Sequence, residues 1–154
     1  MPRAPFQVLV VPFRRVGDQV EFAVLRREDV SVWQAVAGGG EVGESPEEAA
    51  ARETHEELGI DGPVPLYPLQ TAASIPARFF AERDSWPFGT YVIPEHSFAT
   101  DLTDVEIKIS HEHTDIQWLD YQVAHKVLRF DSNRTALGEL HERLLAADLP
   151  LPVD

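Results

Sequence analysis

The chain has 154 residues, the length of one domain, and its 44% hydrophobic and 25% charged content is typical of a globular protein. It has no apolar run of about 18 residues and its first residues lack a signal-peptide core, so we expect a single cytoplasmic domain, residues 1–154, with no membrane partner. The absence of cysteine excludes disulfides and thiolate metal sites, and a net charge of −13 disfavours a nucleic-acid partner.

Two strands and a glycine-rich loop are predicted before the first helix. Residues 6–11 form a continuous β-prone run, and a turn signal at Gly17-Asp18 leads to a second run over residues 21–25, so the two runs predict a hairpin. An apolar stretch over residues 32–37 ends in three glycines. Those glycines, residues 38–40, predict a flexible loop.

The clearest helix is predicted over residues 46–58. Ser45 is suited to the N-cap, Pro46 to the first helical position, and Glu48 to the third, where it completes a capping box. Gly59 is placed to end the helix in the left-handed conformation. The helix is therefore expected between a glycine loop and an extended, proline-rich connection.

Further strands and two helices are predicted after this point. Strands are expected over residues 69–75, 78–81, 90–93 (ended by Pro94), 105–109 and 116–119. Asp120 is expected to cap a helix reaching Leu128. A last helix from about Ser132 carries apolar residues at helical spacing: Ala136, Leu137, Leu140, Leu144 and Leu145. This order predicts the α/β class, of α+β type, with a mixed sheet between helices.

Three carboxylates on the predicted helix have the spacing of a metal site. Glu53, Glu56 and Glu57 lie at i, i+3 and i+4, so they share one helix face. Their mutual repulsion would be relieved by a bound cation, and carboxylate oxygens suit Mg²⁺ or Mn²⁺. A solvated acidic face is the alternative, and the three glutamates by themselves favour it.

The wider pattern around these glutamates is that of a known family. From Gly38 the chain reads glycine, five residues, Glu44, seven residues, and then Arg-Glu-Thr-His-Glu-Glu-Leu-Gly-Ile, ending at Ile60. This pattern resembles the Nudix box at every fixed position, with Thr54 in place of one bulky apolar residue. The resemblance implies the Nudix fold and a hydrolase that cleaves phosphoanhydride bonds with divalent metal ions.

The resemblance also implies roles for individual residues. Glu53, Glu56 and Glu57 correspond to catalytic metal ligands, Arg52 to the arginine that orients them, and Glu44 to a member of the same network. The carbonyl of Ala37 or Gly38 corresponds to a further metal ligand. Glu112, on a loop six residues before Trp118, resembles a loop glutamate that acts as an extra ligand or as the general base. A surface loop glutamate is the alternative for that residue.

Substrate-binding residues carry weaker signals. Arg26, Arg27 and Arg78 are phosphate-binding candidates, and Trp33, Phe79, Phe80 and Trp86 are candidates for stacking on a ring. For each of them, a solvated strand end or core packing is the alternative.

Two segments outside the box resemble one bacterial subgroup. Residues 32–39 and 130–134 are similar to dihydroneopterin triphosphate pyrophosphatases, also described as dATP pyrophosphohydrolases, which release pyrophosphate. The partner is then a nucleotide or pterin polyphosphate. Pro76 keeps ADP-ribose open as a substrate, and dinucleoside polyphosphates and nucleotide sugars stay open as well. A non-catalytic nucleotide-binding regulator is a further alternative, which the complete set of box glutamates disfavours. Either a monomer or a homodimer is compatible with these features.

Overall fold

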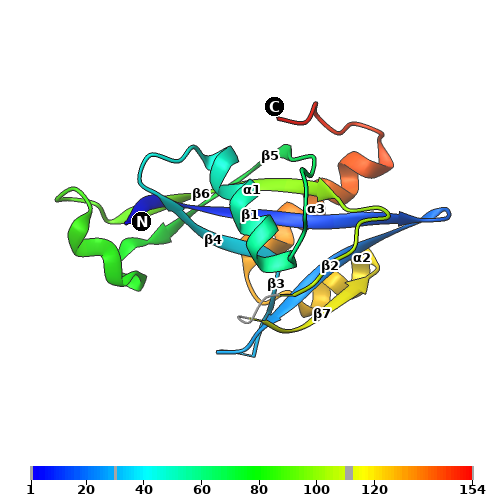
Figure 1. The fold of residues 1–154 in the computed structure, drawn as a ribbon, viewed down its shortest axis with the longest axis horizontal. Helices are drawn as coiled ribbons and strands as arrows, with labels where there is room; N and C mark the ends of the chain where they lie inside the picture. The colour runs from blue at the N-terminus through cyan, green and yellow to red at the C-terminus, as the bar shows by residue number, and fades with distance from the viewer. Residues whose placement is uncertain (1, 30, 110–112, 154) are drawn as a thin grey trace.

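A mixed β-sheet forms the centre of the protein in a computed structural model, which describes residues 2–29, 31–109 and 113–153 (Figure 1). Its seven strands are β1 (Arg3–Val16), β2 (Gln19–Arg27), β3 (Trp33–Gln34), β4 (Val36–Glu41), β5 (Tyr67–Pro76), β6 (Val92–Asp101) and β7 (His113–Leu119). The helices are α1 (Pro46–Leu58), α2 (Tyr121–Val127) and α3 (Asp131–Leu145), with short 3-10 turns η1 (Ala77–Phe79) and η2 (Ala81–Ser85). Within the described residues, no helix has the length and apolar character needed to cross a membrane.

Strand β1 organises the sheet, and Figure 1 shows it crossing the length of the molecule. Its first part pairs antiparallel with β4 and its last part with β2, closing the predicted hairpin at Val16 and Gln19. Along its other edge it pairs in parallel with β6. The sheet order is β3-β2-β1-β6-β5, with β4 added to β1 and β7 added to β2.

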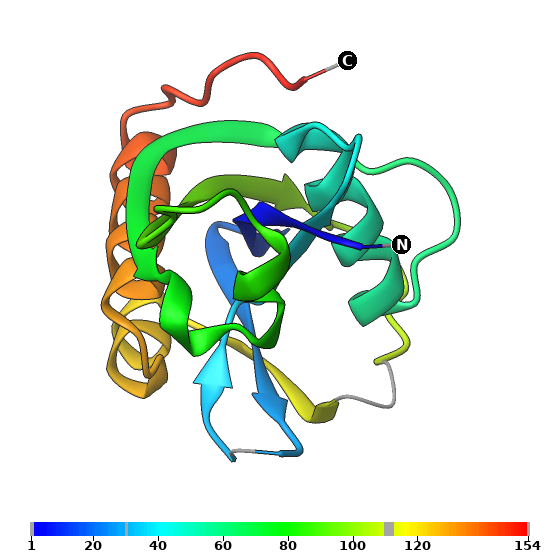
Figure 2. The same cartoon turned by 90° about the vertical axis from the view of Figure 1, so that its left-hand side faces the viewer.

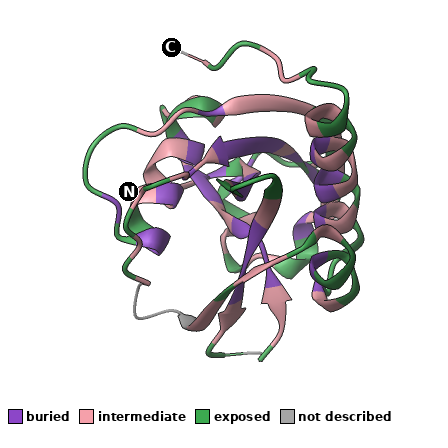
Figure 3. Ribbon diagram, turned by 90° about the vertical axis from the view of Figure 1, so that its right-hand side faces the viewer, coloured by how far each residue is buried: buried purple, intermediate pink, exposed green. Residues whose placement is uncertain are grey.

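Helices cover both faces of the sheet, as the mixed sheet between helices predicted. Figure 2 shows α1 on one side and α3 on the other, and Figure 3 shows the buried residues between them. Because side chains alternate along a strand, β1 supplies both cores. Leu9, Val11 and Phe13 pack with α2 and α3, whereas Val8 and Val10 pack with α1.

Helix α1 confirms the predicted helix at both ends. The Ser45 hydroxyl accepts a hydrogen bond from the Glu48 backbone N–H at 3.1 Å, and the Ser45 N–H donates to Glu48 Oε1 at 2.9 Å. Gly59 ends the helix at φ 58° and ψ 38°, in the left-handed region. These local signals therefore suffice to place the helix that carries the three glutamates.

The predicted glycine loop is wrong, because Gly38, Gly39 and Gly40 lie inside β4. The glycines allow other side chains to approach the β4 backbone closely, and they do not make the segment a flexible loop. A Cβ on Gly39 would lie 2.6 Å from the Arg3 guanidinium, and a Cβ on Gly40 would enter the Phe6 ring. Because these three residues lack side chains, Arg3, Phe6 and Glu53 can pack directly against the backbone of β4.

Two of the predicted strands are absent from the described structure. Arg78 and Phe79 belong to η1 and Ala81 begins η2, with Phe80 between the two turns. Just after them, buried Trp86 donates its ring N–H to the Arg3 carbonyl at 2.8 Å. Residues 105–109 keep the predicted alternation of half-buried and exposed side chains, but their backbone meets the end of α1 through Lys108 N–H and the Leu58 carbonyl at 2.7 Å.

One strand end and one predicted core residue also differ from the prediction. Strand β6 continues through Pro94 instead of ending there, because β1 pairs with β6 only from Glu95 onward and the missing N–H breaks no ladder on that edge. At the other end of the chain, Leu145 is 76% exposed and does not belong to the core. Helix α3 begins at Asp131, which confirms the predicted start near Ser132.

We predict that Gly59→Ala destabilises the protein more than Gly17→Ala. Both glycines have almost the same φ, 58° and 59°, so each alanine costs about 1–2 kcal/mol of backbone strain. The Cβ at position 59 would also collide with the Lys108 carbonyl, whereas position 17 has open space. This collision adds about 1–3 kcal/mol. Urea unfolding of both variants measures the difference, and equal losses would contradict the contact.

Candidate active site

Arg52 joins helix α1 to strand β4. Its Nη2 donates to the Gly39 carbonyl at 2.9 Å, while Nε and Nη2 bind the two oxygens of Glu44 at 2.7 and 3.0 Å. Glu44 in turn accepts the Glu41 backbone N–H at 2.8 Å. The guanidinium hydrogen-bonded to Glu44 holds the pKa of that carboxyl below its usual range, and Glu44 raises the pKa of Arg52.

The same guanidinium contacts two of the three glutamates. Arg52 Nη1 lies 2.9 Å from Glu53 Oε1 and 3.3 Å from Glu56 Oε2. One cation therefore offsets part of the repulsion among the carboxylates. The contacts place Arg52 beside the carboxylates, and its role in orienting them stays a prediction.

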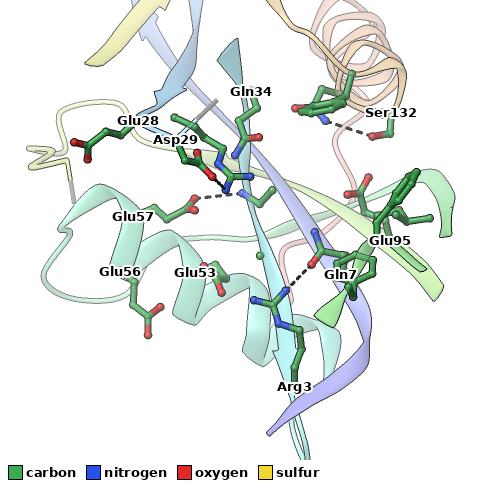
Figure 4. Close-up of a pocket in the computed structure, with 18 residues that line it drawn as sticks. Arg3, Gln7, Glu28, Asp29, Gln34, Glu53, Glu56, Glu57, Glu95 and Ser132 are labelled. Atoms are coloured by element: carbon green, nitrogen blue, oxygen red, sulfur yellow. Dashed lines mark hydrogen bonds and ion pairs between the residues drawn. The ribbon is translucent and has the colours of Figure 1, made fainter. Parts of the chain in front are cut away.

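The three glutamates differ in burial and direction. Glu57 is buried, and its Oε2 accepts the Ala37 backbone N–H at 3.2 Å. The Glu53 carboxylate lies directly over Gly38, where a Cβ would collide with it. Glu56 is 59% exposed. Figure 4 shows Glu53 and Glu57 directed toward β4 and Glu56 pointing outward from the same helix.

The predicted metal site consists of these three carboxylates. Among the side chains that the structure describes, in residues 2–29, 31–109 and 115–153, no three His, Asp or Glu side chains converge closely enough to hold an ion. The donor set nevertheless fits a hard divalent cation, because all three carboxylates line one cavity and Gly38 leaves room for a carboxylate beside the backbone. Rotation of Glu56 away from Arg52 would bring the third carboxylate into the set.

Thr54, the one departure from the box pattern, is fully buried. Its hydroxyl donates to the Ala50 carbonyl at 2.7 Å, within the helix. The buried polar group is thus satisfied, and the substitution affects packing rather than the carboxylates.

A cavity of about 1090 Å³ opens beside the glutamates (Figure 4). Its lining comes from α1, β4, the ends of β1 and β2, the β5–β6 region and the start of α3. The described residues around it are Arg3, Gln7, Arg27, Glu28, Asp29, Gln34, Ala37, Gly38, Glu53, Glu56, Glu57, Ile75, Phe79, Phe80, Glu95, Phe130, Ser132 and Asn133. Carboxylates, arginines and aromatic rings thus share one hollow.

Only one of the predicted phosphate-binding arginines lines this cavity. Arg27 does so, with its Nη2 2.6 Å from Asp29 Oδ2. The structure places Arg26 over the Trp33 ring, which packs against the core of α2 and α3, and Arg78 over Phe79. Arg26, Trp33 and Arg78 are therefore not among the described residues that line the cavity.

The remaining candidates line the cavity, belong to the core or lie outside the described residues. Phe79 and Phe80, weighed as stacking residues, line the cavity, whereas Trp86 is core. Glu112 lies outside the described residues.

Sequence reasoning missed Glu95, which lies in β6 and is 5% exposed. Its Oε1 has no hydrogen-bond partner among the described residues. Burial raises the pKa of the Glu95 carboxyl, and a hydrogen bond with Ser132 acts in the opposite direction. Its sequence neighbours Pro94, His96 and Ser97 give no signal of this burial.

Asn133 was part of a recognised motif, but its role follows only from the structure. Its Oδ1 accepts the Ala35 backbone N–H at 2.9 Å, and its Nδ2 donates to the Ser132 hydroxyl at 3.3 Å. This buried amide fixes the start of α3 against the segment between β3 and β4, which brings Ser132 to the cavity.

Comparison with known proteins decides the family. The NUDIX domain matches residues 5–139, which is most of the chain. The chain belongs to the Nudix family. Its mixed sheet with helices on both faces is the Nudix fold, and it is a Nudix hydrolase that shares this family with pyrophosphatases.

Individual Nudix relatives support this. A protein of Listeria monocytogenes assigned to the NUDIX hydrolases is 46% identical, with a TM-score of 0.86 over 95% of this chain and 98% of that one. The dihydroneopterin triphosphate diphosphatase of Escherichia coli is 29% identical over 89% of this chain and 92% of its own length; the structure of the E. coli pyrophosphohydrolase has a TM-score of 0.71. An octanoyltransferase of Myxococcus xanthus is 31% identical over 86% of this chain, which spans 35% of that protein.

We predict that Glu44→Gln lowers stability at neutral pH by about 1–2 kcal/mol, because the charged partner of Arg52 is lost while the acceptor for Glu41 remains. The folded pKa of Glu44 lies below its ordinary value of 4.5, so this contribution is complete above that value and disappears as the pH falls through the folded pKa.

Urea unfolding of the wild type and Glu44→Gln across this range measures the effect. The difference in the free energy of unfolding should be largest at neutral pH and should disappear at acid pH. Exposed Glu106→Gln is the matched control and should show little difference at any pH. A Glu44→Gln difference that does not change with pH would contradict the ion pair.

Proposed function

We propose that this Nudix hydrolase is a magnesium-dependent pyrophosphohydrolase that releases pyrophosphate from a nucleoside, deoxynucleoside or dihydroneopterin triphosphate. The observation that carries this is the shared cavity, which has Glu53, Glu56 and Glu57 on one side and aromatic and polar groups elsewhere. Its volume of about 1090 Å³ is at the upper end for small-molecule sites. One hollow can therefore accept both a phosphate chain and a ring.

Glu53, Glu56 and Glu57 are the residues that would hold the metal, with the Gly38 carbonyl as a further oxygen donor and Mn²⁺ as a possible substitute for Mg²⁺. A divalent cation bound there supplies stabilisation of charge on the phosphoryl oxygens and a more acidic bound water. Arg52 positions the carboxylates through its contacts with Glu53 and Glu56, and Glu44 and Gly39 hold Arg52 in place.

The remaining steps fall to side chains around the cavity. Arg27 lines it and is our candidate to bind the phosphate chain, exchanging Asp29 for a phosphate oxygen. Hydrolysis joins a water oxygen to phosphorus, breaks the bond to pyrophosphate and passes the water proton to a carboxylate. We propose one of Glu57, Glu53 and Glu112 as the general base. A pyrophosphate leaving group agrees with the name of the E. coli relative, a dihydroneopterin triphosphate diphosphatase.

Other features of the sequence hypothesis stay predictions. These are cytoplasmic residence and a monomeric or homodimeric state. The substrate-binding roles of Arg26, Trp33 and Arg78 also stay predictions, and their place outside the cavity lining favours Arg27, Phe79 and Phe80 in those roles.

We predict that Glu57→Gln lowers kcat for triphosphate hydrolysis at least about 100-fold, since even outer-shell changes at metal sites cost 10–100-fold. Glu57 is the buried member of the set, and glutamine keeps its shape and its acceptor for Ala37. Glu47→Gln, on the exposed first turn of the same helix, is the matched control and should retain activity. Full activity of Glu57→Gln would remove it from the site.

A substrate panel with Mg²⁺, read by mass spectrometry of the products, tests the reaction itself. The panel contains dGTP, dATP, dihydroneopterin triphosphate, ADP-ribose, a dinucleoside tetraphosphate and a nucleotide sugar. Pyrophosphate together with a monophosphate is the expected product pair. AMP with ribose phosphate as the dominant products would instead assign ADP-ribose, and turnover of none of the six would contradict the proposal.

A further inference from the structure

Glu95 is a buried acid that the phosphate chemistry does not use. It lies in β6, next to Gln7 of β1, and both residues line the cavity. Figure 4 shows Glu95 across the cavity from Glu56 and Glu57. The residue is therefore separated from the proposed metal ligands but faces the same hollow.

The surroundings of Glu95 leave it incompletely satisfied. No ion pair to Glu95 occurs among the described residues, and its Oε1 has no hydrogen-bond partner there. The nearby cation Arg3 is engaged with Gln7 at 3.4 Å and with Glu82 at 3.6 Å. A buried acceptor without a partner costs free energy, so its presence in a cavity wall indicates a ligand that donates to it.

The chemistry of a carboxylate restricts that ligand. An ionised carboxylate only accepts hydrogen bonds, and its two oxygens suit two adjacent donors. Guanine and pterin rings present such a pair, a ring N–H beside an exocyclic amino group. Adenine presents a donor beside an acceptor, and that ring acceptor would face a carboxylate oxygen.

The cavity also offers surfaces for a flat ring. Phe79, Phe80 and Phe130 line it, and Phe79 and Phe130 are 67% and 44% exposed. Exposed aromatic rings at a cavity wall are suited to stacking on a heteroaromatic ligand. A ring held there would direct one edge to the wall that carries Glu95.

We propose that Glu95 selects the substrate, accepting hydrogen bonds from the ring N–H and amino group of a guanine or pterin. This inference rests on the proposed function and narrows its substrate class to triphosphates whose ring contains a 2-amino-4-oxopyrimidine unit, as guanine and pterin do. Burial raises the pKa of Glu95 in the free protein, and two donors from the ligand favour its ionised form.

Glu95→Gln tests the inference, because an amide offers one donor and one acceptor and so matches adenine. The measurement is kcat/KM with dGTP, dihydroneopterin triphosphate and dATP. The wild type should prefer the first two. Glu95→Gln should lower kcat/KM for both by about 10–100-fold, the size expected for one bidentate contact, and leave dATP unchanged or improved.

Controls make the outcome decisive. Glu106→Gln removes the same charge at an exposed position away from the cavity and should leave the substrate ratios unchanged. An equal loss on all three substrates in Glu95→Gln, or a wild-type preference for dATP, would overturn the inference. If Glu95→Gln does not fold, the wild-type ratio decides alone.

Binding of neopterin, guanosine and adenosine, which have no phosphate, separates this inference from the proposed function. Calorimetry should show tighter binding of neopterin and guanosine than of adenosine, with the difference lost in Glu95→Gln. That result without any triphosphate turnover would support Glu95 and contradict the proposed function. Triphosphate turnover with substrate ratios that Glu95→Gln does not change would support the proposed function and contradict the role of Glu95.

Discussion

The contact between Arg52 and strand β4 is the constraint on which the site depends. One side chain reaches from the middle of α1 to the Gly39 carbonyl and to both oxygens of Glu44, so the helix is fixed in height and rotation against the sheet. With the helix fixed, Glu57 meets the Ala37 N–H and Glu53 lies over Gly38. The capping box and Gly59 set the helix ends, but Arg52 sets its orientation.

The carboxylates of Glu53 and Glu56 have two alternative partners, which are Arg52 and a bound divalent cation. Arg52 contacts Glu53 and Glu56 in the described arrangement and offsets part of their repulsion, and a divalent cation would compete with it for those oxygens. Glu44 is the contact that keeps Arg52 in place when the glutamates change partner, since its hydrogen bonds to the guanidinium are independent of them. The protein thus pairs two of its three clustered carboxylates with an arginine of the same helix.

Sequence reasoning succeeded where the determinants are local and failed where they are distant. Ser45, Glu48 and Gly59 specify α1 from within the helix itself. The role of Gly38–Gly40 depends on Arg3, Phe6 and Glu53, which meet only in the folded sheet, so the glycines alone predict a loop where the structure has a strand. Alternation over residues 105–109 predicted which side chains face inward but not that the backbone partner is the end of α1. Glu95 became a candidate only when β1, β5 and α3 enclosed it, since nothing next to it in sequence buries it.

An anomalous difference map from crystals grown with Mn²⁺ and a non-hydrolysable triphosphate analogue tests whether the three glutamates of α1 bind the metal. We expect the Mn²⁺ peak within about 2 Å of carboxylate oxygens of Glu53, Glu56 and Glu57. Glu56 should have left Arg52, while Arg52 remains on Glu44 and Gly39. A map in which Glu56 still pairs with Arg52 and the ion lies away from α1 would contradict the account.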